Sequence, residues 1–195
     1  MPEPPAVPEL PAPPARAHLT ARRPVELRLV SFGRRYGWRD RPYMNTWLDV
    51  EGLARAYQDD TAHACSGQSG AVQFQVATSI GFLQAVADAK AQILHYLEAA
   101  PAGQVATVGF RCRSGRHRSV AMVCMLERIL NELGVAVVSE HLDQRGPGKR
   151  PSCGCPDNCA NFRGLSVDEQ RAQAASDLED HRAALTIAKR AWAHA

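Results

Sequence analysis

Apolar residues along the chain follow two spacings, and these alternate from one segment to the next. Residues 25–32 (VELRLVSF) alternate between apolar and polar and end apolar, and 43–50 and 104–110 are similarly rich in β-formers. We therefore expect a strand over each of these segments. A short apolar run over 135–139 predicts a fourth strand.

Between these runs the apolar residues recur at helical spacing. They predict a long helix over about 73–99 and another that begins near Ser119 and stops at Gly134, since glycine commonly ends a helix. A last helix, over 166–192, opens with the capping-box pattern SVDE; its apolar stripe is thin, so we expect it to pack on the outside. The stripes are Val76, Ile80, Leu83, Val86, Ile93, Leu94 and Leu97, then Val123, Leu126, Ile129, Leu130 and Leu133, and finally Leu178, Leu185 and Trp192.

Strands that alternate with helices predict an α/β fold, here a single three-layer domain with a largely parallel sheet. We place this domain at 25–165 and a C-terminal helix, packed on the domain or extending it, at 166–195. Residues 1–24 hold eight prolines, which disfavour both helix and sheet, so a disordered tail is expected there. A ligand for a proline-reading module is the alternative.

Size and composition favour one soluble domain. The chain has 195 residues, no run as long as the roughly 20 apolar residues of a membrane helix, and no secretory signal pattern at its start. We therefore expect a cytoplasmic protein that does not enter a membrane. In that compartment its six cysteines suggest free thiols or metal ligands before disulfides.

The net charge of +3 is mild, but positive charge is concentrated in three loops. Ligands of parallel α/β sheets bind beyond the carboxyl ends of the strands, which points to 31–43, 109–119 and 140–152. These loops carry 11 of the 23 lysines and arginines: Arg34, Arg35, Arg39, Arg41, Arg111, Arg113, Arg116, Arg118, Arg145, Lys149 and Arg150, against Asp40, Glu140 and Asp143. Because like charges repel, the shared edge is expected to hold an anion.

The sequence VGFRCRSGRHRSV, residues 108–120, is the centre of this charge and runs from a strand into a helix. Unpaired amides at a helix N-terminus favour an anion, and Gly115 allows a close approach of the backbone. Arg118 offers a planar fork for phosphate oxygens, and Ser119 can cap the helix or donate its hydroxyl. We expect a phosphate site; a solvated basic turn or a contact with an acidic protein are the alternatives.

The same turn also fits the Cys-x5-Arg-Ser spacing of cysteine-dependent phosphatases. In that hypothesis Cys112 is the nucleophile, Arg118 binds the phosphate and Ser119 assists the leaving thiolate. Asp40 or Asp49 would be the general acid. Arg111 stands where that signature usually has histidine, so we expect a binding domain rather than an enzyme.

RNA binding is a further hypothesis, since the loop SFGRRYGWRDRPY interleaves aromatic residues with arginines. Aromatic faces stack on bases while arginines contact phosphates. The candidates are Arg34, Arg35, Trp38 and Arg39. Phe32 and Tyr43 can instead be strand-end residues that pack in the core.

Three cysteines lie within seven residues, in the sequence CGCPDNC. Cys153, Cys155 and Cys159 can reach one Zn²⁺, with Cys65 or His63 as a fourth ligand. Free surface thiols or a redox pair are the alternatives. Cys124 lies in an apolar helical stretch and is expected to be a small core residue.

The run from about 25 to 143 resembles the C-terminal domain of the RapZ family of RNase adaptor proteins. The motifs SFGRRYG (31–37), LDVEGL (48–53) and RCRSGRHRSV (111–120) stand in the family's order, each at the end of a strand. The resemblance implies a regulatory domain that binds a phosphorylated small molecule, such as an amino-sugar phosphate or a nucleotide, and that contacts structured RNA. The resemblance and the chemistry of the turn together point to the following site residues: Cys112, Arg113, Ser114, Gly115, Arg116, His117, Arg118, Ser119, Asp49 and Arg34.

The chain departs from the family pattern at several of these positions. Arg111 and Arg113 replace a glycine and a threonine, Ser114 replaces a glycine, and Glu51 replaces an arginine. The added arginines suit a more highly charged ligand or nucleic acid. The Walker motif of the family's ATP-binding N-terminal domain does not occur in this sequence, so nucleotide hydrolysis is not expected here.

Overall fold

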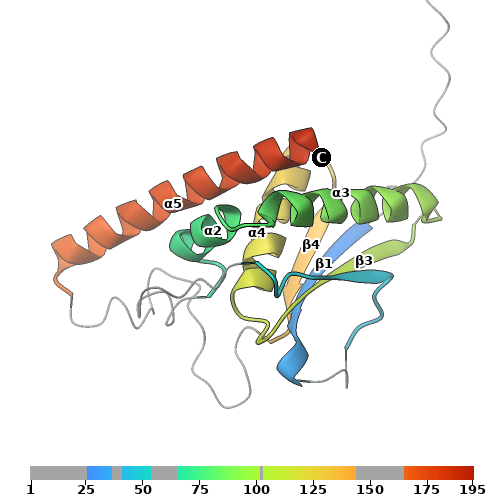
Figure 1. Ribbon diagram of the computed structural model, residues 1–195, viewed down its shortest axis with the longest axis horizontal. Helices are drawn as coiled ribbons and strands as arrows, with labels where there is room; N and C mark the ends of the chain where they lie inside the picture. Colours follow the sequence, from blue (N-terminus) through green and yellow to red (C-terminus); the bar gives the residue numbers. More distant parts are fainter. Residues whose placement is uncertain (1–25, 37–40, 54–65, 102, 144–164) are drawn as a thin grey trace, which may run out of the picture.

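A computed structural model describes residues 26–36, 41–53, 66–101, 103–143 and 165–195 (Figure 1). Several predictions fall outside these residues: the proline-rich tail, Trp38, Arg39, Asp40, His63, Cys65, Arg145, Lys149, Arg150, and the possible zinc ligands Cys153, Cys155 and Cys159. No helix in the described ranges combines the length and the apolar character needed to cross a membrane.

The sheet has four strands, all parallel as the sequence predicts, and their order is β2-β3-β1-β4. The strands are β1 (Glu26–Gly33), β2 (Thr46–Asp49), β3 (Val105–Cys112) and β4 (Val137–His141). The register places Gly33 beside Cys112 and Asp49 beside Arg111, and β4 ends level with β1 at His141. All four carboxyl ends therefore meet at one edge of the sheet.

The helices stack in two layers over one face of this sheet (Figure 1). They are α2 (Gly70–Ala77), α3 (Phe82–Ala99), α4 (Arg118–Glu132) and α5 (Val167–His194), with a 3-10 turn η1 (Arg34–Tyr36) after β1. Helices α3 and α4 contact the strands, and α5 crosses α2, α3 and α4 on the side away from the sheet. This stack of sheet, inner helices and α5 confirms the three-layer α/β fold.

The core lies between the sheet and the inner helices. Successive side chains of a strand point to opposite faces, so Leu27 and Leu29 of β1 and Val108 and Phe110 of β3 all enter the helix layer. Each of these side chains is fully buried. The strands are thereby held rigidly, and their carboxyl ends present the candidate site.

The single long helix predicted over 73–99 is wrong, because the chain forms two helices there. Ser69 caps α2 by accepting a hydrogen bond from the Val72 amide, and α2 ends before Thr78. Gly81 then takes a left-handed φ of 88° and turns the chain into α3. The change of direction leaves Ile80 and Leu83 exposed, at 95% and 65%, although periodicity places them in the core.

Helix α5 packs outside the inner helices as predicted, but mainly through alanines. Ala184, Ala188, Ala191 and Trp192 are buried, whereas Leu178 is half exposed. Small side chains allow the helices to approach closely. A stripe defined by bulky apolar residues does not include these alanines. The predicted capping box is present: Ser166 Oγ accepts from the Glu169 amide, and the Glu169 carboxylate accepts from the Ser166 amide.

Candidate functional site

The arginine-rich turn between β3 and α4 packs tightly against the end of β1. Gly115 has a φ of 67°, and a methyl group added to it would lie 2.5 Å from the Gly33 nitrogen and 2.8 Å from Asp143 Cβ. The Gly33 amide donates to Asp143 Oδ2 at 2.6 Å. The ends of β1 and β3 and the segment that follows β4 are thus joined in one structure at the carboxyl edge.

The segment 66–69, which the sequence analysis did not assign to the site, packs against the same turn. The Gly67 amide donates to the Arg116 carbonyl at 2.9 Å. A methyl group at Gly67 would overlap the His117 carbonyl oxygen and the Ala121 nitrogen in the first turn of α4. The signal in the sequence is the pair of glycines in SGQSG, but only the fold shows what they approach.

Burial divides the predicted site residues into a floor and a rim. Cys112, Gly115, His117, Arg118 and Ser119 form the floor and are buried, Ser114 and Arg116 are half-buried, and Arg34, Arg35 and Arg113 are exposed on the rim. Ser119 is fully buried, and its Oγ lies 3.2 Å from Cys112 Sγ. The buried floor residues of the turn therefore lie beneath a basic surface formed by the rim arginines.

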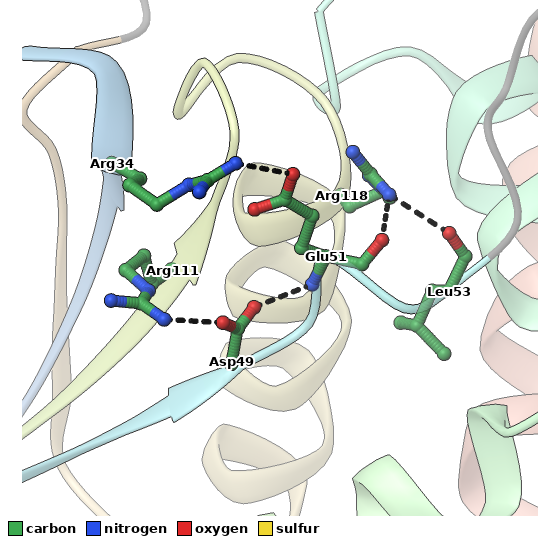
Figure 2. A network of polar contacts seen from close by, with 6 residues as sticks. All are labelled: Arg34, Asp49, Glu51, Leu53, Arg111 and Arg118. Carbon is green, nitrogen blue, oxygen red and sulfur yellow. Dashed lines mark hydrogen bonds and ion pairs between the residues drawn. The ribbon is translucent and has the colours of Figure 1, made fainter.

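The guanidinium of Arg118 is buried and is held by neutral groups. Its Nη1 donates to the carbonyl oxygens of Glu51 and Leu53, the latter at 3.0 Å (Figure 2). Among the described residues, no carboxylate lies within ion-pair distance of this side chain. Arg118 thus secures the segment after β2 while its charge stays unpaired within the described chain.

Three carboxylates at the edge are already paired with arginines: Asp49 with Arg111, Glu51 with Arg34 at 3.0 Å, and Asp143 with Arg41 at 2.7 Å. Figure 2 shows the first two pairs side by side. Burial alone would raise the pKa of Asp49. The hydrogen bonds from Arg111 and the Glu51 amide, with the charges of Arg111 and Arg34, outweigh it and hold that pKa below its usual value. Asp49 is therefore a carboxylate at neutral pH.

Positive charge remains in excess after these pairs form. Within the described residues, Arg35 and Arg113 also form no ion pair, and the Arg35 amide donates to the Arg113 carbonyl at 3.0 Å, which joins the two loops. The amides of Ser114, Gly115 and Ser119 have no hydrogen-bond acceptor in the described part of the chain. Cations and unpaired donors thus face the same edge.

The aromatic residues near this edge differ in exposure. Phe32 is 1% exposed, with the Arg41 guanidinium 5.0 Å from its ring centre, so it belongs to the core. Tyr43 is 83% exposed, which contradicts a core role. Trp47, not among the candidates, is 40% exposed and stacks with the Arg111 guanidinium at 4.1 Å.

The described residues contain no group of three histidine, cysteine or acidic side chains placed to hold a metal ion. Cys124, predicted as a core residue, is only half-buried at the residue level. Its Sγ lies 3.8 Å from His141 Nε2, and His141 Nδ1 lies 2.8 Å from Ser31 Oγ. These side chains form a small polar cluster between α4, β4 and β1.

A parallel sheet whose strand ends converge on a glycine-centred basic turn defines the chain as an α/β domain with the layout of ligand-binding α/β proteins. Residues 25–145 match the family described as the RapZ C-terminal domain, and the chain belongs to that family. No curated protein matches the chain. The matched residues contain all four strands and helices α2, α3 and α4, whereas α5 lies beyond them.

Proposed function

We propose that this domain binds a phosphorylated small molecule, a sugar phosphate or a nucleotide, at the turn of residues 112–119. The observation that carries the proposal is the buried Arg118 guanidinium, whose described partners are backbone carbonyls only. A buried charge without a counter-charge is costly, so an arriving oxyanion would be bound with a large gain. Arg118 would keep its carbonyl contacts through one nitrogen and offer its remaining N–H groups.

The surroundings of Arg118 support the same ligand chemistry. The unpaired amides of the turn and of the first turn of α4 are donors that phosphate oxygens accept well. The exposed arginines Arg34, Arg35 and Arg113 raise the local concentration of anions at this edge. Asp49 and Glu51, between these arginines, are acceptors for hydroxyl or amino groups of the same ligand.

The test is a titration of the purified protein with inorganic phosphate, glucose 6-phosphate and AMP, by thermal shift and calorimetry. A ligand at 100 times its Kd stabilises the folded state by about 2.7 kcal/mol, which raises Tm by several degrees. Arg118→Lys keeps the positive charge but loses the planar guanidinium that can bind two phosphate oxygens, and we expect at least a tenfold loss of affinity for phosphate. Arg171→Ala removes an exposed arginine of α5 whose partner among the described residues is the exposed Asp168, and it should bind as the parent does.

Two results would overturn the proposal. One is the absence of any shift with all three phosphates. The other is an affinity in Arg118→Lys equal to that of the parent protein, since the turn would then not be where the anion binds.

RNA is the second candidate ligand, supported by the continuous basic rim that the Arg35–Arg113 contact creates. Reversal of Arg34 and Arg35 to glutamate should weaken binding to a structured RNA. It should also reduce the slope of log affinity against log salt concentration by about one for each phosphate contact that is lost. The same double variant should weaken binding of inorganic phosphate less than binding of RNA, because the buried Arg118 and the turn amides are unchanged. RNA affinity that is unchanged by the reversal would exclude this surface.

A cysteine-dependent phosphatase is less well supported. The contact of Cys112 Sγ with Ser119 Oγ suits a thiolate nucleophile. Of the two candidate general acids, Asp40 lies outside the described residues, and Asp49 is held ionised by Arg111, so Asp49 cannot donate a proton at neutral pH. We therefore expect no hydrolysis of p-nitrophenyl phosphate above that of a Cys112→Ser variant, and turnover that disappears in this variant would favour the enzyme.

A further inference from the structure

Helix α5 holds the first turn of α2 in place. A methyl group added to Gly70 would overlap the Asp177 carbonyl oxygen, so the two helices touch backbone to backbone there. Asp177 Oδ1 accepts a hydrogen bond from the Ala71 amide at 3.3 Å, and His181 lies one turn further along α5. The position of α2 therefore depends on α5.

Gln73 of α2 is the polar side chain that faces this contact from inside. It is 1% exposed, and its Oε1 lies 3.0 Å from His181 Nδ1. Its Nε2 donates to the carbonyl oxygens of Gly67 at 3.0 Å and Gln68 at 3.4 Å. Because both amide hydrogens point to carbonyls, Oε1 is the acceptor and His181 donates to it through Nδ1.

The segment that Gln73 holds is the one that packs on the arginine-rich turn. Gly67 donates to the Arg116 carbonyl and lies directly against the His117 carbonyl and the Ala121 nitrogen. A continuous series of contacts thus runs from His181 of α5 through Gln73 and Gly67 to the residue before the start of α4. Every hydrogen bond in this series involves a buried or half-buried group, where an unmade bond is costly.

We infer that Gln73 is a positioning residue that couples α5 to the anion-binding turn. The inference rests on the proposed function, since it is the turn of residues 112–119 whose geometry Gln73 sets. Helix α5 lies outside the residues that match the family, so an element beyond the matched range holds the turn in shape. Loss of the Gln73 contacts should loosen the segment 66–69 and, with it, the first amides of α4.

The first measurement is amide hydrogen exchange by NMR in the full-length protein. Gln73→Met keeps the length of the side chain but removes all its hydrogen bonds, and His181→Phe removes the donor from the α5 side. We expect both to speed exchange at Gly67 and Ala121, whose amides donate to the carbonyls of Arg116 and His117, by at least tenfold, with amides of β3 changed much less. Lys189→Met is the matched control, since it removes another contact from α5, the 2.6 Å ion pair with Glu132 at the far end of α4.

The second measurement is the affinity for inorganic phosphate in the same variants. We expect a threefold to tenfold loss in Gln73→Met and His181→Phe at temperatures well below Tm, and no loss in Lys189→Met. Exchange at the turn that is no faster than in the control would overturn the coupling. If the parent protein binds no phosphate, the proposed function fails, and the exchange data still decide whether Gln73 and α5 control the turn.

Discussion

Single glycines decide the shape of the turn. Gly115 needs both a left-handed backbone and a close approach to β1, whereas Gly134 has a φ of 81° with open space around it. Gly134→Ala should therefore cost only the backbone strain, about 1 kcal/mol. Gly115→Ala adds a clash with rigid backbone, and we expect at least about 2 kcal/mol more in denaturant unfolding. Equal losses of unfolding free energy in the two variants would show that the turn relaxes to accommodate the added methyl group.

The Cys124 thiol is predicted to be unreactive in the folded protein. Burial raises its pKa from the ordinary value of a thiol to about 12, and the nearby Glu127 carboxylate adds to this effect. Since only the thiolate is alkylated, iodoacetamide at pH 8 should modify Cys124 on the order of 1000-fold more slowly than in the unfolded chain. Peptide mass spectrometry measures both rates, and a difference below tenfold would contradict the assigned environment.

At the scale of single residues, the sequence predicts only part of the candidate site. The motif CRSGRHRS predicts that Cys112, Arg118 and Ser119 come together, because they lie close in the chain at a strand-to-helix turn. Nothing in it predicts that Arg118 holds the carbonyls of Glu51 and Leu53, or that Gly67 packs on the turn. These are contacts between distant segments, and local spacing carries no information on them.

At the scale of elements, all four strands and the start and end of α4 follow from the sequence pattern. The boundary between α2 and α3 does not, because the apolar spacing continues through Ile80 and Leu83 while the backbone turns at Gly81. A glycine inside a helical pattern is tolerated often enough that it does not by itself predict a break. Helix α5 was predicted in position, but its alanine contacts depend on how closely its neighbours approach.

The docking of α5 on α2 should depend on pH through Asp177. Burial raises the pKa of this carboxyl, but the neighbouring His181, whose Nε2 lies 3.4 Å from Asp177 Oδ2, and hydrogen bonds from the amides of Ala71 and Gly70 lower it more. A pKa below its unfolded value stabilises the fold above about pH 4, and this stabilisation is lost as pH falls through the folded pKa. Asp177→Asn should thus cost about 1 kcal/mol at pH 7 and progressively less below pH 4, as measured by urea unfolding.

Glu179→Gln provides the comparison for this variant. Glu179 is an exposed residue of the same helix, and its replacement should change the stability by less than about 0.5 kcal/mol at either pH. A loss in Asp177→Asn that is the same at pH 3 and pH 7 would mean that the carboxylate charge is not what holds α2.

At the scale of the whole molecule, α5 and the inner helices should unfold together. Trp192 is 8% exposed at the end of α5, its carbonyl accepts from Lys90 Nζ of α3 at 2.9 Å, and that ammonium lies 5.8 Å from its ring centre. Trp192→Ala should cost about 3 kcal/mol and keep a single transition, by calorimetry. Leu178→Ala, at a half-exposed position of the same helix, should cost less than about 1 kcal/mol. A separate early transition in the first variant would show that α5 melts alone.

The general plan of the molecule could be predicted, since alternating strands and helices restrict it to a parallel sheet with its site at the carboxyl edge. The charge balance of that edge could not. The sequence shows an excess of arginines, but it does not show which of them Asp49, Glu51 and Asp143 neutralise. Only the pairing leaves Arg118 as the buried cation without a described counter-charge.

The family match ends at residue 145, whereas the hydrophobic core includes Ala184, Ala188, Ala191 and Trp192. A shortened protein cut at the family boundary would leave the outward side of α2, α3 and α4 without its cover and Gln73 without its histidine. Such a fragment is a poor substitute for the full chain in ligand screens, because a failure to bind would report the missing helix as readily as the missing ligand.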